Sequence, residues 1–249
     1  MGIRLGGVGY LRESGGVDAF AKKRLIALTA LTALVLALAL VSASYGEYAK
    51  VGVKEVGQVL AHKIGLGPDT SDATAELVVD LRLPRVALGI LAGAALAMAG
   101  AALQGLFRNP LADPALIGVS GGSAFGAVLV IVLGGGALAD LNNYFGAFAL
   151  PVAAMLGGAG VTFLIYHLAK VSGRTEVTLM LLTGLAFNAL AGAAIGLLVY
   201  LATDEQMRAF WFWSLGSLQR AGWPQIGAAA VFILPALVVL PRWARQLNA

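Results

Sequence analysis

Six long intervals without a charged residue constrain this sequence more than any other feature. A helix that crosses about 30 Å of hydrocarbon needs about 20 apolar residues, because each residue advances the helix by about 1.5 Å. Each interval is long enough for one crossing, and they cover residues 25–46, 86–107, 114–139, 141–169, 177–203 and 221–241. The sequence therefore predicts an all-α fold, a polytopic transmembrane helical bundle with about six spanning helices.

The composition supports a membrane protein and excludes several kinds of site. Only 12% of the 249 residues are charged, whereas a soluble globular domain carries about 25%. The chain has no cysteine, which excludes disulfides and thiolate metal sites. The net charge of +4 comes from basic residues scattered between the apolar runs, so we expect membrane lipid around the chain and no nucleic-acid partner.

The distribution of basic residues predicts the orientation. Alternate connecting segments carry more basic than acidic residues, and the basic ones are Arg4, Arg12, Lys22, Lys23, Arg24, Arg108, Lys170, Arg174, Arg242 and Arg245. The positive-inside rule then places a tail of residues 1–24 and residue 249 in the cytoplasm, in a multi-pass protein of the cytoplasmic (inner) membrane. A signal peptide with Ser42 and Ser44 near its cleavage site is the alternative, although the first run exceeds a usual signal-peptide core of about 7 to 15 residues.

Two segments between the spans are expected to lie at the membrane surface. The external segment 45–85 contains VKEVGQVLAHKIG, in which one helix face gathers Val53, Val56, Val59, Leu60 and Ile64. It predicts an amphipathic helix that caps the bundle, followed by the loop GLGPDTSD. The piece AFWFWSLGSLQ (209–219) is rich in aromatic residues and too short to span, so it predicts an interfacial or re-entrant helix.

Small and polar residues inside the spans indicate helix contacts. Three G-x-x-x-G pairs favour close packing, and the run 86–102 is rich in alanine and glycine, which predicts a central helix crowded by neighbours; the pairs are Gly89 with Gly93, Gly122 with Gly126, and Gly192 with Gly196. Gln104 and Asn188 are the clearest polar residues within spans.

A stripe on the fifth run combines both kinds of residue. Gly184, Asn188 and Gly192 recur every four residues, so they share one helix face. The stripe is either a tight helix contact or part of a translocation path. Two histidines lack acidic or histidine neighbours at ligand spacing: His62 is expected to be solvated and His167 to be interfacial, so no metal site is predicted.

No catalytic constellation is visible. No lysine follows a glycine, which excludes a phosphate-binding G-K-[ST] loop, and GGGALA at residue 134 ends a span without following a strand of a nucleotide-binding fold. Neither a Ser, His and Asp set nor a pair of intramembrane carboxylates appears. The chain is therefore not expected to be an enzyme, and energy for uphill transport would have to come from another subunit.

Two motifs carry a resemblance to a known family. The stretch RLPRVALGILAGAALAMAGAALQGLFRNPLADPALIGVSGGSAFGA (82–127) and the later FWFWSLGSLQRAGW are similar to the permease subunits of ABC importers for iron-siderophores, haem and vitamin B12. The resemblance runs from residue 25 to the C-terminus. It implies a second permease subunit, forming a homodimer or heterodimer, cytoplasmic ATPase subunits that bind ATP and Mg, and an extracytoplasmic substrate-binding protein. No cofactor is expected in this chain itself.

The proline-rich stretch is predicted to be a rigid turn. Prolines cannot continue a helix, while asparagine and aspartate side chains bond turn backbone and cap the next helix; the residues are Asn109, Pro110, Leu111, Asp113 and Pro114. The resemblance implies that this turn lies at the cytoplasmic mouth of the path. There Asn109 and Leu111 would form a gate facing Val177 and Thr178, and a purely structural turn is the alternative.

Arg82 and Arg85 lie at the outer end of the second run. They would either anchor the helix in lipid headgroups or, as the resemblance implies, pair with glutamates of the binding protein that docks on the permeases.

The resemblance also implies more chain than this sequence contains. Permeases of this family have roughly ten spans and, after the sixth, a cytoplasmic helix pair that contacts the ATPase, whereas this sequence ends at RWARQLNA. We therefore expect a partial permease domain over residues 1–249, from a truncated gene, a partial chain, or a protein completed by a second polypeptide.

The function predicted from the sequence is import by alternating access of an iron-siderophore first, with haem or cobalamin as the other ligands. A non-ATP secondary transporter, a channel, or a degenerate permease that no longer transports are the alternatives. Inverted repeats with broken helices or an intramembrane charge relay would favour the secondary transporter, and none is visible in the sequence.

Overall fold

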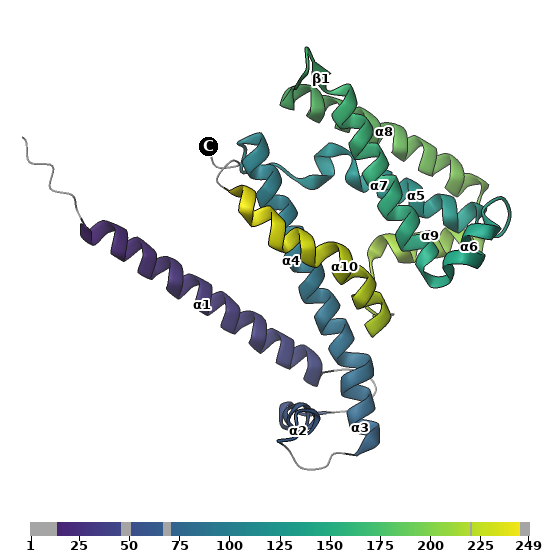
Figure 1. Ribbon diagram of the computed structural model, residues 1–249. Coiled ribbons are helices and arrows are strands. Elements are labelled where there is room, and N and C mark those ends of the chain that lie inside the picture. The colour runs from purple at the N-terminus through teal and green to yellow at the C-terminus, as the bar shows by residue number, and fades with distance from the viewer. Residues whose placement is uncertain (1–13, 46–50, 67–70, 220, 245–249) are drawn as a thin grey trace, which may run out of the picture. The chain divides into compact units, whose positions relative to one another are not determined.

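The computed structural model describes residues 14–45, 51–66, 71–219 and 221–244 (Figure 1). Almost all of the regular structure in these ranges is helical, which confirms the all-α fold. The chain divides into two compact units, residues 1–86 and 87–249. Each unit is described below by itself.

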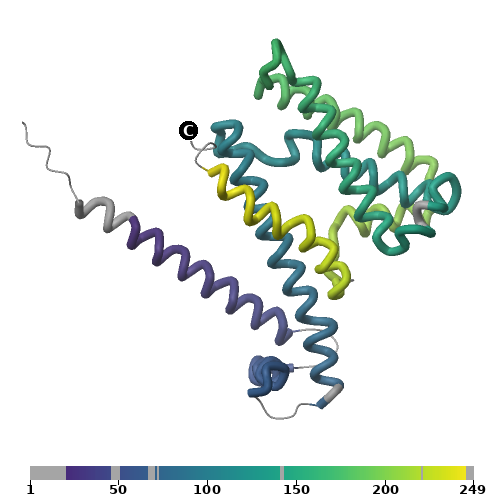
Figure 2. Tube along the Cα trace, in the orientation of Figure 1, coloured from purple at the N-terminus to yellow at the C-terminus, as the bar shows by residue number. Residues whose placement is uncertain are grey.

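The first unit contains a long apolar helix and a small helical cluster. Its elements are α1 (Ser14–Ser44), α2 (Val53–Lys63), α3 (Asp72–Glu76), the π-helix η1 (Leu77–Arg82) and the first residues of α4 (Leu83–Phe107). The segments α3, η1 and α4 follow one another without a break, so residues 73–107 form one helix of 35 residues, which Figure 2 shows as an uninterrupted coil.

The predicted amphipathic helix is confirmed as α2, and two of the five residues of its predicted apolar face are buried. Val56 and Val59 are 0% and 1% exposed in a small core with Ala43, Val51 and Val78. Val53 and Ile64, assigned by the sequence to the same face, remain exposed. The core ties α2 to the C-terminal end of α1 and to η1, and residues 67–70 of the predicted loop lie outside the described residues.

The second unit contains the remaining helices. After α4 come η2 (Pro114–Ile117), α5 (Val119–Leu133), α6 (Ala139–Phe145), η3 (Gly146–Phe148), α7 (Ala149–Leu168), α8 (Val177–Leu201), α9 (Asp204–Leu215), α10 (Trp223–Val239) and η4 (Leu240–Trp243). An antiparallel hairpin of β1 (Lys170–Val171) and β2 (Arg174–Thr175) joins α7 to α8. Its turn places Ser172 and Gly173 at positive φ.

Helix α5 is the centre of this unit, and α7, α8 and α9 pack around it (Figure 1). The pair Gly122 and Gly126 makes the backbone contact that the sequence predicted. A Cβ added at Gly126 would lie 2.2 Å from the carbonyl oxygen of Ala153, and one added at Gly157 would lie 2.2 Å from that of Gly122. Only glycine allows α5 and α7 to approach this closely.

The other two glycine pairs do not make such contacts in the part of the chain that the structure describes. Cβ atoms added at Gly93, Gly192 and Gly196 would meet no atom within 4 Å, and one added at Gly89 would make only an ordinary contact with Leu218. The crowding by neighbouring helices that was predicted for residues 86–102 is not observed either. The most apolar stretch of this helix contains no buried residue.

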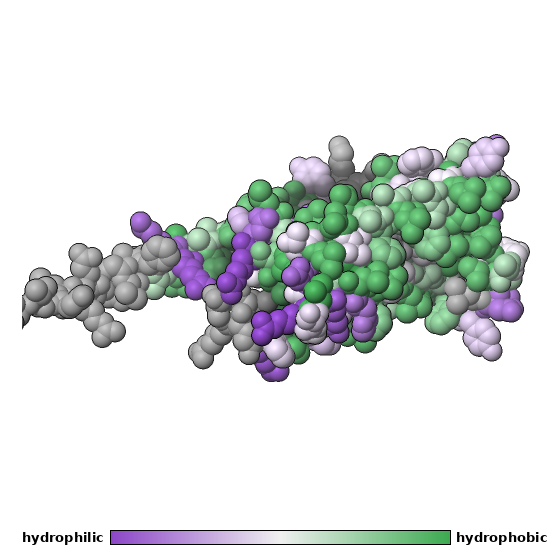
Figure 3. Space-filling view, turned by 90° about the horizontal axis from the view of Figure 1, so that it is seen from above, coloured by the Kyte–Doolittle hydropathy of each residue, from purple (hydrophilic) through white to green (hydrophobic). Residues whose placement is uncertain are grey.

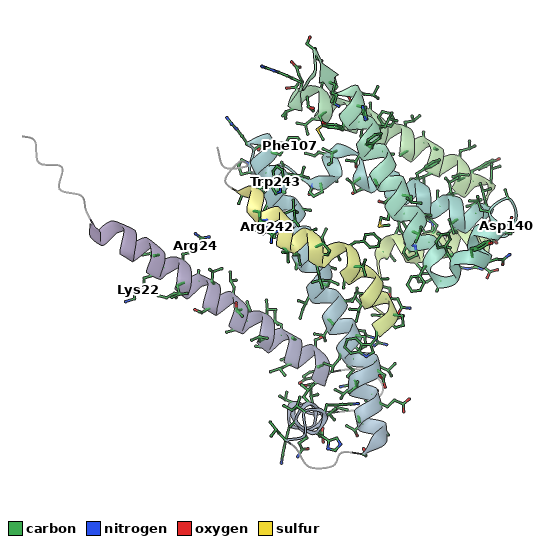
Figure 4. All side chains as sticks on the ribbon, in the orientation of Figure 1. Lys22, Arg24, Phe107, Asp140, Arg242 and Trp243 are labelled. Carbon is green, nitrogen blue, oxygen red and sulfur yellow. The ribbon has the colours of Figure 1, made fainter. Side chains whose placement is uncertain are left out.

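Among the residues that the structure describes, five helices are long and apolar enough to cross a membrane. They are 21–44, 73–107, 143–168, 177–201 and 223–243, while α5 is a shorter apolar helix of 15 residues. The six predicted runs thus correspond to six apolar helices, one of which is too short to span on its own. Apolar side chains cover much of the face shown in Figure 3, as expected for a surface that contacts lipid or other protein. Lys22 and Arg24 project near the start of the first span (Figure 4).

Candidate functional site

The turn between α4 and η2 is built as the sequence predicted. Arg108 adopts a positive φ of 49° and ends α4, which Figure 4 shows terminating at Phe107. The Asn109 side chain accepts a hydrogen bond from the Leu111 backbone N–H at 2.9 Å. The Asp113 carboxylate accepts one from the Ala115 N–H at 2.6 Å, which caps η2.

Prolines complete this turn. Pro114 occupies the start of η2, where its missing N–H costs nothing, and Pro110 lies between the two side-chain caps. The structure therefore contains the predicted capped turn, whereas its rigidity and its role in a gate stay predictions. Ala112 is 5% exposed inside the turn, whereas the Leu111 side chain is 83% exposed.

Helix α8 contacts η2, the short helix that follows this turn. The Asn188 amide nitrogen Nδ2 donates to the Ala115 carbonyl at 2.8 Å. A Cβ added at Gly184 would lie 2.1 Å from the Leu116 carbonyl oxygen. These two residues support the helix-contact interpretation of the stripe, whereas Gly192, one turn further along, faces open space in the described structure.

A small apolar cluster fixes the same region from the other side. Ile117, Ile165, Ala169 and Met180 are buried together and are flanked by partly buried residues of α4, α5, α7 and α8. Helix η2, which follows the turn, thus packs between α7 and α8. Val177 and Thr178 lie exposed in the first turn of α8.

Arg82 has a contact that the sequence did not reveal. It is 5% exposed, and its Nη1 donates to the carbonyl oxygens of Ala43 at 2.9 Å and Ser44 at 2.7 Å. These are the last carbonyls of α1, which have no partner within their own helix and carry the negative end of the helix dipole. Arg85 is half-buried in the first turn of α4. Neither observation tests docking of a binding protein, which stays a prediction.

The aromatic segment after α8 is a capped helix. Thr203 and Gln206 form a reciprocal capping box at its start, so α9 begins five residues before the predicted piece and ends at Leu215. Phe210 is buried at 8% exposure, while Trp211 and Phe212 are exposed. The Gln206 amide also donates from Nε2 to the Val132 carbonyl of α5 at 3.0 Å, an interhelical contact that was not predicted.

The two histidines differ in their surroundings. The His167 ring lies edge-on to Phe163 with centroids 4.3 Å apart, at the end of α7. His62 lies exposed in the last turn of α2. Within the described residues, no three histidine or acidic side chains gather as a metal site would require.

The second unit is an apolar helical bundle in which a capped Asn-Pro turn leads into η2, and η2 packs on Gly184 and Asn188 of α8. Residues 33–249 match the FecCD transport family. The chain belongs to this family. The match includes all of the second unit and most of the first.

Individual relatives of the FecCD family agree with this assignment. The chain is 41% identical to the hemin transport system permease protein HmuU of Yersinia pestis over 179 residues, which are 72% of this chain and 52% of that protein. It is 36% identical to the cobalamin import system permease protein BtuC of Halobacterium salinarum over 176 residues, 70% of this chain and 45% of that protein. The chain thus spans about half the length of the relatives it matches.

A solved structure shares the fold. It is a metal-chelate type ABC transporter in an inward-facing conformation, with a TM-score of 0.69 and 29% sequence identity over 89% of this chain and 63% of that chain. The predicted resemblance to permeases for iron-siderophores, haem and vitamin B12 is therefore confirmed at the level of the family. The chain is a multi-pass membrane protein of a transport family.

Proposed function

We propose that this chain is the membrane-spanning permease part of an ATP-driven importer that moves a metal chelate into the cytoplasm. Membership of the FecCD transport family carries this proposal. An extracytoplasmic binding protein delivers the ligand, and ATP with Mg is bound by separate cytoplasmic ATPase subunits. This chain supplies part of the path together with a second permease subunit.

The proposed orientation places the N-terminus, the α4–η2 turn and the β1–β2 hairpin on the cytoplasmic side. Basic residues concentrate in these segments, as the positive-inside rule requires. The start of α4 and the α9 helix then lie at the outer surface. The membrane is the cytoplasmic one, because ATP is supplied there.

The proposed inner gate is the turn with Asn109 and Leu111. Its backbone is fixed by side-chain caps, and its Leu111 side chain is 83% exposed. An apolar side chain held outward on a rigid turn is suited to closing a path against an equivalent surface of a second permease. Val177 and Thr178, exposed at the start of α8, are the proposed opposing residues in this chain.

The proposed mechanism is alternating access, in which the turn moves as one piece with the helices of its permease. ATP binding and hydrolysis on the ATPase subunits rock the two permeases, so that the path opens first to the outside and then to the cytoplasm. Gly192 belongs to the part of the stripe proposed to line this path, because it is exposed in the described structure, whereas Gly184 and Asn188 contact η2.

The ligand class rests on the relatives. The names of two relatives specify hemin and cobalamin, and the structural neighbour is of metal-chelate type. An iron-siderophore is the first ligand predicted from the sequence. The 41% identity to the hemin permease makes hemin the first probe to test, with a ferric siderophore and cobalamin beside it.

The test is uptake of labelled ligand by the organism that carries this gene. Cells with and without the gene are given iron-labelled hemin, iron-labelled ferrichrome and cobalt-labelled cobalamin in separate experiments. Loss of ATP-dependent uptake of one of the three on deletion, restored by the gene on a plasmid, is expected. Unchanged uptake of all three, with no ATPase subunit co-purifying with the chain, would contradict the proposal.

A further inference from the structure

Helix α5 is too short to cross a bilayer. Its 15 residues extend about 22 Å, against about 30 Å of hydrocarbon. At least one of its ends therefore lies within the apolar layer, where no water is available to hydrogen-bond the last backbone groups of the helix. Partners for these groups must come from the protein.

At the amino-terminal end of α5, the interhelical bond goes to the short helix that leads into α5 and not to the first N–H groups of α5 itself. The Ala115 carbonyl, in the short helix η2 that leads into α5, accepts Nδ2 of Asn188 at 2.8 Å, from a residue 73 positions later in the chain. The other amide atom, Oδ1, lies so close to α5 that a Cβ added at Gly121 would be 2.5 Å from it. Glycine at position 121 thus leaves room for this amide, whose Oδ1 is buried and has no hydrogen-bond partner among the described contacts.

At the carboxyl-terminal end, by contrast, the last carbonyls of α5 itself accept hydrogen bonds. The Val130 carbonyl accepts from the Gly134 N–H, and the Leu133 carbonyl accepts from the N–H groups of the following glycine-rich turn. The Val132 carbonyl accepts Nε2 of Gln206 at 3.0 Å, from a residue 74 positions away. The same Gln206 side chain uses Oε1 to accept the Thr203 N–H at the start of α9.

We propose that Asn188 and Gln206 are positioning residues that clamp the two ends of α5, one from α8 and the other from α9. Both amides reach backbone carbonyls across a helix interface, and between them α5 is packed against α7 by backbone-to-backbone glycine contacts. Asn188 thus fixes η2, which follows the turn at residues 109–113, at one end of α5, and Gln206 fixes α9 at the other end. The clamp joins the proposed inner gate to the outer surface, and only this consequence for gating rests on the proposed function.

Thiol reactivity measures the clamp directly because the natural chain contains no cysteine. Ala112→Cys places a reporter in the turn, and Val130→Cys places one near the far end of α5; the natural residues are 5% and 6% exposed. The full chain is reconstituted in lipid vesicles, and the rate of N-ethylmaleimide modification is measured at each reporter. This readout requires neither ligand nor ATPase, so it fails or succeeds independently of the proposed transport.

Each amide is then changed in a way that isolates the interhelical bond. Asn188→Leu keeps the approximate size and removes the donor to Ala115. Gln206→Glu retains the acceptor that caps α9 and removes the donor to Val132, since glutamate is also a preferred residue of a capping box. Thr183→Val is the matched control on α8, because the Thr183 hydroxyl bonds only the Leu179 carbonyl of its own helix in the contacts described.

If the clamp exists, losing either interhelical bond should raise the rate of N-ethylmaleimide modification at the cysteine nearest to that bond. Asn188→Leu is expected to increase the modification rate of Ala112→Cys by roughly threefold, and Gln206→Glu that of Val130→Cys by a similar factor, as about 0.6 kcal/mol of lost interhelical hydrogen bonding would give. Thr183→Val should leave both rates unchanged. Circular dichroism of every variant checks that the helices remain folded.

The clamp would be overturned by unchanged modification rates in both amide variants, or by an equal rise in rate in the Thr183→Val control. It would also be overturned if a second, unrelated stabilising change were enough to restore the natural rate in Asn188→Leu. If Asn188→Leu or Gln206→Glu fails to fold, Asn188→Ser and Gln206→Met replace them. Rescue is then sought in Asn188→Gln, whose amide can still donate to Ala115. A rate in Asn188→Gln as high as in Asn188→Ser would also contradict a role for the amide.

Discussion

Arg82 is buried beside two carbonyls at the end of a helix, and this contact gives the residue a structural role within its own chain. The guanidinium holds the C-terminal end of α1 through Ala43 and Ser44. Hydrogen bonds of this kind that involve a charged group contribute about 1.5 to 3 kcal/mol each to stability, more than neutral ones. The same residue was predicted to dock a binding protein, so the two roles must be separated by experiment.

The first prediction concerns the stability role of Arg82. Arg82→Gln is expected to destabilise the chain by about 1.5 to 3 kcal/mol, because the carbonyls of α1 lose a charged donor that is 5% exposed. The measurement is the apparent melting temperature in detergent, followed by size-exclusion chromatography after heating. Arg174→Gln, in the exposed hairpin, is the matched control and should melt as the natural chain does. Equal melting of Arg82→Gln and the natural chain would show that the contact is unimportant.

The docking prediction is tested at Arg85. Arg85→Glu reverses one charge of the proposed docking pair and leaves the contact between Arg82 and α1 in place. We expect capture of the cognate binding protein by the assembled importer to weaken by at least about tenfold, as close charge pairs across interfaces do. Surface plasmon resonance on the reconstituted complex measures it. Unchanged affinity would remove Arg85 from the docking site.

At the scale of helices, the close approach of α5 and α7 depends on particular glycines. Gly157 lies where a Cβ would overlap the Gly122 carbonyl oxygen, whereas Gly160, less than one turn further along α7, meets nothing within 4 Å. Both are glycines of the same helix. They differ only in the face on which they lie, which makes them a matched pair.

Gly157→Ala is therefore expected to lower stability by about 1 to 3 kcal/mol, since the added methyl group forces the two backbones apart. Gly160→Ala should be neutral or slightly stabilising, because alanine is a better helix former than glycine. Thermal melting of the two variants in the same detergent decides between them. Equal destabilisation by both substitutions would show that the α5–α7 contact is not the cause.

Much of the helical pattern could be predicted from charge-free intervals, and the departures have physical reasons. The interval 114–139 predicts one span, but Gly118 adopts a positive φ and glycines 134–136 form a turn, so only α5 remains helical between them. The charge-free interval that predicted the aromatic helix begins only after Arg208. The Thr203 and Gln206 capping box places the start of α9 earlier, and this signal was present in the sequence.

The site was predictable where its bonds are local. Asn109 and Asp113 bond backbone two residues away, so their residue types were enough to predict the capped turn. The bonds of Arg82, Asn188 and Gln206 reach partners 38 or more residues away. No residue pattern in a single sequence specifies which distant carbonyl such a side chain meets.

For the whole molecule, the central claim is that the Asn-Pro turn lies at the cytoplasmic face of a transport permease. The described chain places Leu111 at the exposed apex of this turn, and the absence of natural cysteine allows one introduced thiol to be followed alone. Leu111→Cys, in the otherwise natural chain, is therefore the most direct probe of orientation. A thiol at Tyr45, at the other end of the first span, serves as the control for the opposite face.

The measurement is modification by a membrane-impermeant maleimide in sealed right-side-out and inside-out vesicles from cells that express the chain. The account predicts that Leu111→Cys is labelled only in inside-out vesicles and Tyr45→Cys only in right-side-out ones. Labelling of Leu111→Cys in right-side-out vesicles, with Tyr45→Cys labelled in the opposite preparation, would contradict the account.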